Sequence, residues 1–141
     1  MGFSIKLDTN GSRPKHTKKL IDGGLVDYIA MDIKTDPFCY DPLIEKDSNT
    51  ANLLTTINVI MESGLDYEFR TTCVKRLVNE QIIERIAKLI KNARRYALQL
   101  FNKVEVLHPE FFNNSDSYYN EKDLLHLKSL AEPWVQECIV R

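Results

Sequence analysis

Five polar residues stand at or just beyond the ends of four segments that have the apolar pattern of β-strands. They are Asp8, Asp32, Lys34, Arg70 and Gln99. Because the carboxyl ends of parallel strands meet along one rim, where α/β proteins bind ligands, we expect these side chains to converge. Together they suit a zwitterion such as an amino-acid headgroup. Arg70 or Lys34 would hold its carboxylate, and Asp8 or Asp32 would hold its ammonium or a bridging cation.

Each of these residues also has a structural interpretation. Asp8, in the word Asp-Thr-Asn-Gly, could cap the turn that follows it. Asp32 could neutralise Lys34 or Arg70 as a structural ion pair, and Gln99 alone says little. The same feature at the ends of four strands is harder to explain in this way. The sequence therefore predicts a ligand-binding mouth and does not specify a reaction.

Other chemical signals are weak. The sequence has no glycine-rich phosphate loop, which argues against a nucleoside triphosphate or dinucleotide site. The three histidines lack metal-ligand spacing with one another. Cys39, Cys73 and Cys138 lie far apart, so we interpret them as reduced, mostly structural thiols in a reducing compartment.

The composition is that of one ordinary domain. The chain has 141 residues, 43% of them hydrophobic, and a net charge of −1, so no overall field attracts nucleic acid or an anionic membrane. The basic run at 13–19 lacks aromatic neighbours that could stack on bases, so we interpret it as a solvated helix face. No apolar run approaches the roughly 20 residues of a membrane-spanning helix, and no signal peptide is recognisable. The expected location is the cytoplasm.

The elements that must position the mouth follow from periodicity and breaker residues. Strands are expected at 3–8, 28–33, 67–72, 96–100 and 135–140, and helices at 15–22, 53–61, 82–90 and 120–132. Strands separated by helices of this length pair in parallel through right-handed crossovers. We therefore predict a single α/β domain over residues 1–141. Periodicity alone leaves open whether the sheet is part of a barrel or an open, doubly wound sheet.

The mouth residues lie in short sequence motifs that resemble those of a known family. Leu7-Asp-Thr-Asn-Gly11, Val26-Asp-Tyr-Ile-Ala-Met-Asp-Ile-Lys34, Phe69-Arg-Thr-Thr72 and Leu98-Gln-Leu-Phe101 occur in order. Together they resemble the later strands of radical S-adenosylmethionine (SAM) activating enzymes. Among these, the anaerobic ribonucleotide reductase activating proteins are the most similar, with the pyruvate formate-lyase activating enzymes nearby. The resemblance implies the C-terminal portion of a partial (β/α) barrel.

The resemblance also implies an activity and roles for the mouth residues. In this family a four-iron, four-sulfur cluster cleaves SAM to a 5′-deoxyadenosyl radical, which removes hydrogen from a glycine of a partner enzyme. Asp8 and Thr9, with Asp32, match positions that hold a monovalent cation near the SAM carboxylate. Asp32 and Lys34 match an Asp-x-Lys element beside the methionine moiety. The full set of expected cofactor-binding residues is Asp8, Thr9, Asn10, Asp32, Lys34, Arg70 and Gln99.

One departure from the family limits this expectation. The family's Cys-x-x-x-Cys-x-x-Cys motif and its Gly-Gly-Glu element are absent, and three neighbouring thiolates are needed to leave the fourth iron open for SAM. The spacing of Cys39, Cys73 and Cys138 does not replace them. We therefore interpret the chain as a C-terminal part without the cluster-binding strands, and we assign it no catalytic residue.

The expected partners follow from the same interpretation. They are a glycyl radical enzyme of the anaerobic ribonucleotide reductase type, and either a separate N-terminal half or a second copy paired along the strand at 3–8. Two other functions stay open. One is a non-catalytic docking domain, and the other is a small enzyme centred on Lys34 with Asp8 and Asp32.

Overall fold

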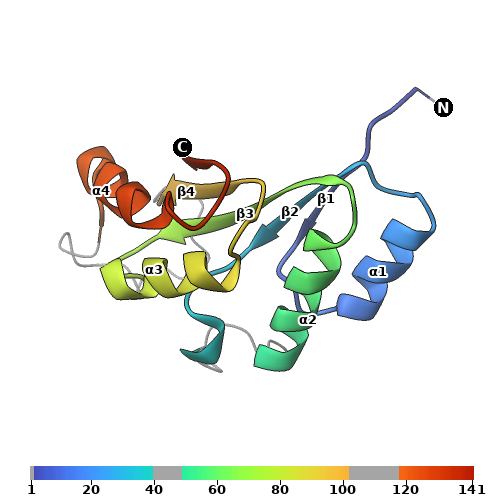
Figure 1. Ribbon diagram of the computed structural model, residues 1–141, viewed down its shortest axis with the longest axis horizontal. Helices are drawn as coiled ribbons and strands as arrows, with labels where there is room; N and C mark the ends of the chain where they lie inside the picture. The colour runs from blue at the N-terminus through green and yellow to red at the C-terminus, as the bar shows by residue number, and fades with distance from the viewer. Residues whose placement is uncertain (1, 40–48, 102–117) are drawn as a thin grey trace.

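Five parallel strands alternate with helices in the computed structural model, which describes residues 2–39, 49–101 and 118–141 (Figure 1). The elements, in chain order, are β1 (Lys6–Thr9), α1 (Pro14–Asp22), β2 (Tyr28–Asp32), the short 3₁₀ helix η1 (Pro37–Cys39), α2 (Thr50–Met61), β3 (Asp66–Cys73), α3 (Glu80–Leu89), β4 (Tyr96–Leu100), α4 (Glu121–Ala131) and β5 (Cys138–Val140). The predicted α/β class and the parallel pairing are confirmed.

The strand order answers the question that periodicity left open. The order in the sheet is β1-β2-β3-β4-β5, so each strand lies beside its neighbour in the chain and the order never reverses. A doubly wound sheet has such a reversal, whereas a barrel adds its strands in sequence. The sheet is therefore a barrel-type portion, as the resemblance implies.

Local chemistry explains most of the element boundaries. Pro14 is the first residue of α1, where its missing N–H costs nothing. Asn79 accepts a hydrogen bond from the Ile82 backbone at the start of α3, and Asn120 forms a capping box with Asp123 at the start of α4. All three starts follow from the sequence.

The starts of three elements differ from those expected at 3, 53 and 135, because β1 begins at Lys6, α2 at Thr50 and β5 at Cys138. The alternating pattern that begins at Phe3 predicts a strand over 3–8, but β1 begins at Lys6, and Phe3 and Ile5 are exposed. The end of α1 at Asp22 is as expected, and Gly24 beyond it takes the left-handed conformation, with φ of +65°. Gly23 keeps a right-handed helical φ of −78° and donates its backbone N–H to the last turn of α1. The predicted polar loop at 113–117 lies outside the described residues.

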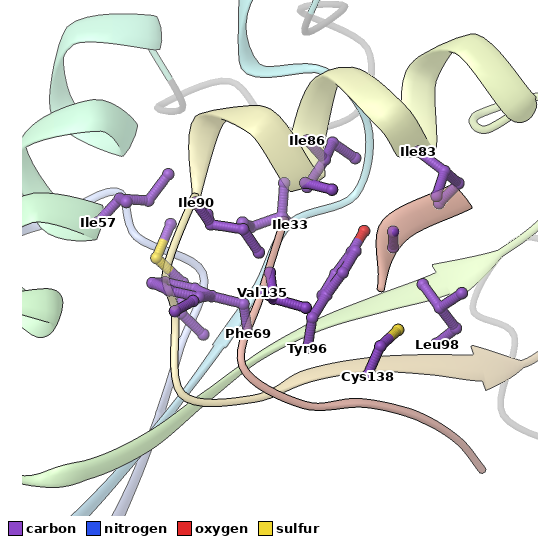
Figure 2. Packing of buried hydrophobic residues seen from close by; sticks show 14 of the residues in the cluster. Ile33, Ile57, Phe69, Ile83, Ile86, Ile90, Tyr96, Leu98, Val135 and Cys138 are labelled. Atoms are coloured by element: carbon purple, nitrogen blue, oxygen red, sulfur yellow. The ribbon is translucent and has the colours of Figure 1, made fainter. Parts of the chain in front are cut away.

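The hydrophobic core lies between the sheet and the helices (Figure 2). Alternate strand residues point into it, among them Ile29 and Met31 of β2, Phe69 of β3 and Tyr96 of β4, each with no exposed surface. The apolar sides of α2, α3 and α4 contribute to the same cluster. Val135, which precedes β5, and Cys138, the first residue of β5, also belong to it. Figure 1 shows α1, α2 and α3 side by side along the sheet.

The opposite face of the sheet is polar. Strand alternation places on it Lys6 and Asp8 from β1, Tyr28, Ala30 and Asp32 from β2, Glu68, Arg70 and Thr72 from β3, and Ala97 and Gln99 from β4. We call it the polar face. The general rule that helices cover both faces of a parallel sheet does not hold for the described parts of the chain, in which the helices pack on the apolar face.

Two further findings concern the surroundings of the sheet. Strand β1 pairs with β2 along one edge, and within the described ranges no strand pairs with its other edge. The association expected there stays a prediction. None of the helices that the structure describes is long and apolar enough to cross a membrane.

Candidate functional site

Asp8, Arg70 and Asp32 form a connected cluster at the carboxyl ends of β1, β3 and β2. The Nε of Arg70 donates to Oδ1 of Asp32 at 2.9 Å, and its Nη2 lies 3.3 Å from Oδ1 of Asp8. The side chain of Arg70 is only 15% exposed, against 44% for Asp32 and 60% for Asp8. The predicted convergence of these residues on one side of the sheet is therefore confirmed. We call them the acid–arginine cluster.

The strand register explains why these side chains meet. Asp32 lies directly beside Arg70 across the β2–β3 pair, and Asp8 lies beside Ala30 across the β1–β2 pair. Burial lowers the pKa of Arg70, but the hydrogen bond and charge of Asp32, followed by the charges of Asp8 and Glu68, raise it further than burial lowers it. Arg70 is thus a permanent cation between carboxylates.

The structural interpretations of the two aspartates have different outcomes. Asp32 does form an ion pair with Arg70, as its structural interpretation requires. Asp8 does not cap the following turn through its side chain. That turn is instead held by Thr9, whose Oγ1 accepts from the Gly11 N–H at 3.1 Å, and by Asn10, whose Oδ1 accepts from the Ser12 N–H at 3.0 Å.

Gly11 completes this turn and anchors it to the helices. Its φ of +81° is in the left-handed region that favours glycine, and its carbonyl accepts a hydrogen bond from the hydroxyl of Thr56 on α2 at 2.7 Å. The turn fixes the end of β1 and so fixes Asp8. In this turn the Thr9 hydroxyl accepts from the backbone N–H of Gly11. Strand alternation also places the side chains of Thr9 and Asp8 on opposite faces of the sheet.

A pocket of about 190 Å³ lies beside the cluster. Its polar wall contains Asp32, Lys34, Arg70 and Thr72, and its apolar wall contains Ile33, Val74, Leu77 and Phe101. Lys34 is thereby placed at the mouth, as the sequence predicts. Gln99 lies one strand further away, opposite Thr72 in the register of β3 and β4 and on the polar face.

Sequence reasoning missed a second charged group on the polar face. Glu68 is 2% exposed, and its Oε2 lies 2.9 Å from the Nη2 of Arg141. The same oxygen has no aligned hydrogen bond, so the contact with Arg141 is an ion pair without good hydrogen-bond geometry. Burial, followed by the nearby charge of Glu68, raises the pKa of Tyr28. The available signal was that Glu68 and Arg70 are two residues apart on one strand and so share a face.

The cysteines lie where the interpretation as structural thiols places them. Cys73 and Cys138 are buried, and burial raises the pKa of each thiol to about 12. Cys39 is exposed in η1.

Among residues 2–39, 49–101 and 118–141, no group of three or more His, Cys, Asp or Glu side chains is arranged to hold a metal ion. The expected monovalent cation stays a prediction, and in this structure Arg70 supplies the positive charge between Asp8 and Asp32.

Fold and site together define an α/β sheet of barrel type with an ion-paired mouth at the carboxyl ends of its strands. No family model matches the chain. The chain is 31% identical, over 144 residues, to a protein of Methanocaldococcus jannaschii that is named as a glycyl-radical enzyme activating enzyme. The match covers 99% of this chain and 59% of that relative, so the chain spans about three fifths of the relative's length.

A solved structure supports the fold independently. The chain is similar to the crystal structure of a domain of pyruvate-formate lyase-activating enzyme from Bacteroides vulgatus, with a TM-score of 0.72 and 13% identity. The similarity covers 98% of this chain and 81% of that domain. At this identity the similarity establishes the fold alone.

Proposed function

We propose that this chain supplies the SAM-binding mouth of a radical SAM activating enzyme, which generates a glycyl radical on a partner of the anaerobic ribonucleotide reductase type. The observation that carries the proposal is the acid–arginine cluster beside the pocket. It stands at the rim where the resemblance requires a SAM-side site. The name of the M. jannaschii relative supports the same class of activity.

The charges at the mouth fit the amino-acid part of SAM. Asp8 and Asp32 are acidic, whereas Arg70, Lys34 and Lys6, which lies 3.3 Å from Asp8, are basic, so the mouth carries separated charges of both signs. Separated charges of both signs suit a zwitterion, whereas a polyphosphate would need cations without competing carboxylates. A carboxylate has several lone-pair sites, so Asp32 can hold Arg70 and still accept from a ligand ammonium.

Each wall of the pocket then has a task. Arg70 and Lys34 bind and orient the ligand carboxylate, and Asp32 binds the ammonium. The apolar wall formed by Val74, Leu77 and Phe101 excludes water from the rest of the ligand. In the activating enzymes that the chain resembles, SAM is the source of the radical.

The iron–sulfur cluster of such enzymes does not fit the described residues. Two of the three cysteines are buried in the core, and their thiols are held protonated by burial, whereas iron is bound by neighbouring thiolates. We therefore propose no cluster ligand and no cluster-dependent step in this chain. Radical formation would need cysteines from elsewhere in the enzyme.

Equilibrium binding of SAM tests the proposal directly. We expect calorimetry to detect SAM binding to this chain, and Asp32→Asn and Arg70→Gln to weaken it at least tenfold. Asp22→Asn is the matched control, because Asp22 forms an exposed ion pair with Lys18 on α1, away from the mouth. Absence of SAM binding to the wild-type chain, or equal weakening by the control, would sink the assignment.

The identity of the partner needs a separate comparison. We expect the chain to bind an anaerobic ribonucleotide reductase more tightly than a pyruvate formate-lyase in a paired calorimetric titration. The reverse preference would retain the activating-enzyme class and replace the partner.

A further inference from the structure

Glu68 has an unusual position for a carboxylate. It lies on the central strand β3, on the polar face rather than in the apolar core, yet it is only 2% exposed. At least one long side chain of the same face, that of Arg141, contacts it. A buried carboxylate is strongly disfavoured unless cations or hydrogen-bond donors compensate its charge, so its neighbours are informative.

One neighbour is the guanidinium of Arg70. Arg70 contacts Asp32, which lies beside it, and also Asp8, which belongs to the next row of the register. The residue between Asp8 and Glu68 in that row is Ala30. Ala30 is small and 0% exposed, so the row between Asp8 and Glu68 leaves room for the long side chain of Arg70 to reach Asp8. Glu68 and Arg70 are two residues apart on β3 and so share the polar face, and the charge of Glu68 contributes to the raised pKa of Arg70.

The other neighbours are Arg141 and Tyr28. Arg141 follows β5 and reaches Glu68 at 2.9 Å, crossing the row that contains Ala97, which is also 0% exposed. Burial, followed by the charge of Glu68, raises the pKa of Tyr28. The two alanines thus leave room for Arg70 and Arg141 to extend across the polar face.

We infer that Glu68 is a positioning residue of the mouth and the central anion of an alternating charge ladder. The ladder runs Asp8/Asp32–Arg70–Glu68–Arg141 across the polar face. This inference rests on the proposed function, because it makes Glu68 the residue that holds Arg70 ready for the ligand carboxylate. Glu68 itself does not line the pocket and touches no ligand.

Electrostatics gives the reason for this role. With Glu68 neutral, Arg70 and Arg141 would face each other as like charges without the intervening anion. Arg70 and Arg141 would then compete for the carboxylates of Asp32 and Asp8, and the guanidinium group of Arg70 would lose its fixed orientation. A fixed fork is what makes guanidinium binding of a carboxylate specific.

The test is Glu68→Gln, which preserves the shape and removes the charge. The matched control is Glu137→Gln, because Glu137 pairs with Arg95 at 3.0 Å but is 50% exposed. Three readouts apply to each variant: the Nε–Hε signal of Arg70 by nitrogen-15 NMR, the SAM dissociation constant, and the titration of Tyr28. The Tyr28 titration is isolated by difference from Tyr28→Phe in the same background.

In Glu68→Gln we expect the Arg70 signal to shift or broaden, the SAM dissociation constant to rise at least tenfold, and the pKa of Tyr28 to fall. Glu137→Gln should leave the Arg70 signal and the pKa of Tyr28 in place and the dissociation constant within twofold of wild type. A Glu68→Gln variant that matches this control in the Arg70 signal and in SAM affinity overturns the inference.

Two further outcomes are also decisive. If the wild-type chain binds no SAM, the proposed function fails, and the Arg70 signal alone then decides whether Glu68 positions Arg70. If Glu68→Gln does not fold, Arg141→Gln replaces it, because Arg141 is 40% exposed and can lose its charge without leaving a buried cation. An unchanged Arg70 signal in Arg141→Gln would refute the ladder.

Discussion

Replacing Arg70 with methionine removes the central charge of the acid–arginine cluster and keeps most of the aliphatic part of the side chain. The substitution breaks the 2.9 Å bond to Asp32 and the 3.3 Å pair with Asp8. A hydrogen bond to a charged group contributes about 1.5–3 kcal/mol when well buried, and an exposed ion pair about 0.2–1 kcal/mol. Because Asp32 and Asp8 are 44% and 60% exposed, the lower part of these ranges applies.

We therefore expect Arg70→Met to reduce the free energy of unfolding by about 1–2 kcal/mol, which corresponds to a melting temperature lower by about 3–8 °C for a chain of this size. The assay is urea denaturation followed through Trp134, the single tryptophan. Arg95→Met is the control, because Arg95 has a comparable 3.0 Å bond to Glu137 but is 38% exposed. Its expected cost is below about 0.5 kcal/mol.

A double-mutant cycle with Asp32→Asn separates the pair from other effects. We expect a coupling energy of about 1 kcal/mol between Arg70 and Asp32. Costs that are equal for Arg70→Met and Arg95→Met, or a coupling energy near zero, would refute the argument that burial makes the mouth cluster energetically distinct.

Two further predictions concern the core and a helix start. At pH 8 a thiol whose pKa is about 12 is ionised in about one molecule in ten thousand, so iodoacetamide should label Cys39 while Cys73 and Cys138 react only on unfolding or as the pH rises toward 12. Mass spectrometry checks this, and reconstitution with iron and sulfide should give no stoichiometric cluster. Asn79→Ala should cost about 1 kcal/mol in urea denaturation, because it removes the 2.8 Å cap from the Ile82 N–H, and a cost below about 0.3 kcal/mol would contradict that assignment.

Much of the fold was predictable because the signals are local. The capping residues Asn79 and Asn120 act within three residues of their own position, and a sequence pattern shows them directly. The extra length predicted for β1 fails for a non-local reason. Alternation continues back to Phe3, but β2 begins at Tyr28, which pairs with Lys6. The Ile5 carbonyl still accepts from the Asp27 and Tyr28 N–H groups, and the strand pairing goes back no further.

The sequence predicts where the site lies but not which of its side chains contact one another. The rule that parallel strands end at one rim is sufficient to gather Asp8, Asp32 and Arg70. Which side chains touch depends on the register between strands, and the sequence of one strand carries no information about it. For the same reason Glu68 looks like an ordinary alternating polar residue until the register places Ala30 beside it and Arg141 within reach.

Charged side chains do not usually cover the centre of a parallel sheet, so the polar face needs a physical explanation. Ala30 and Ala97 provide the answer on this chain. Both side chains are small and have no exposed surface, which leaves room for long side chains across the face. Arg70 pairs with Asp32 on the adjacent β2, and Arg141 reaches past β4 to Glu68 on β3. The face is thereby both packed and charged. A small residue beside each arginine is thus a requirement of the arrangement, because a larger side chain at Ala30 would lift Arg70 away from Asp8 and Asp32 together.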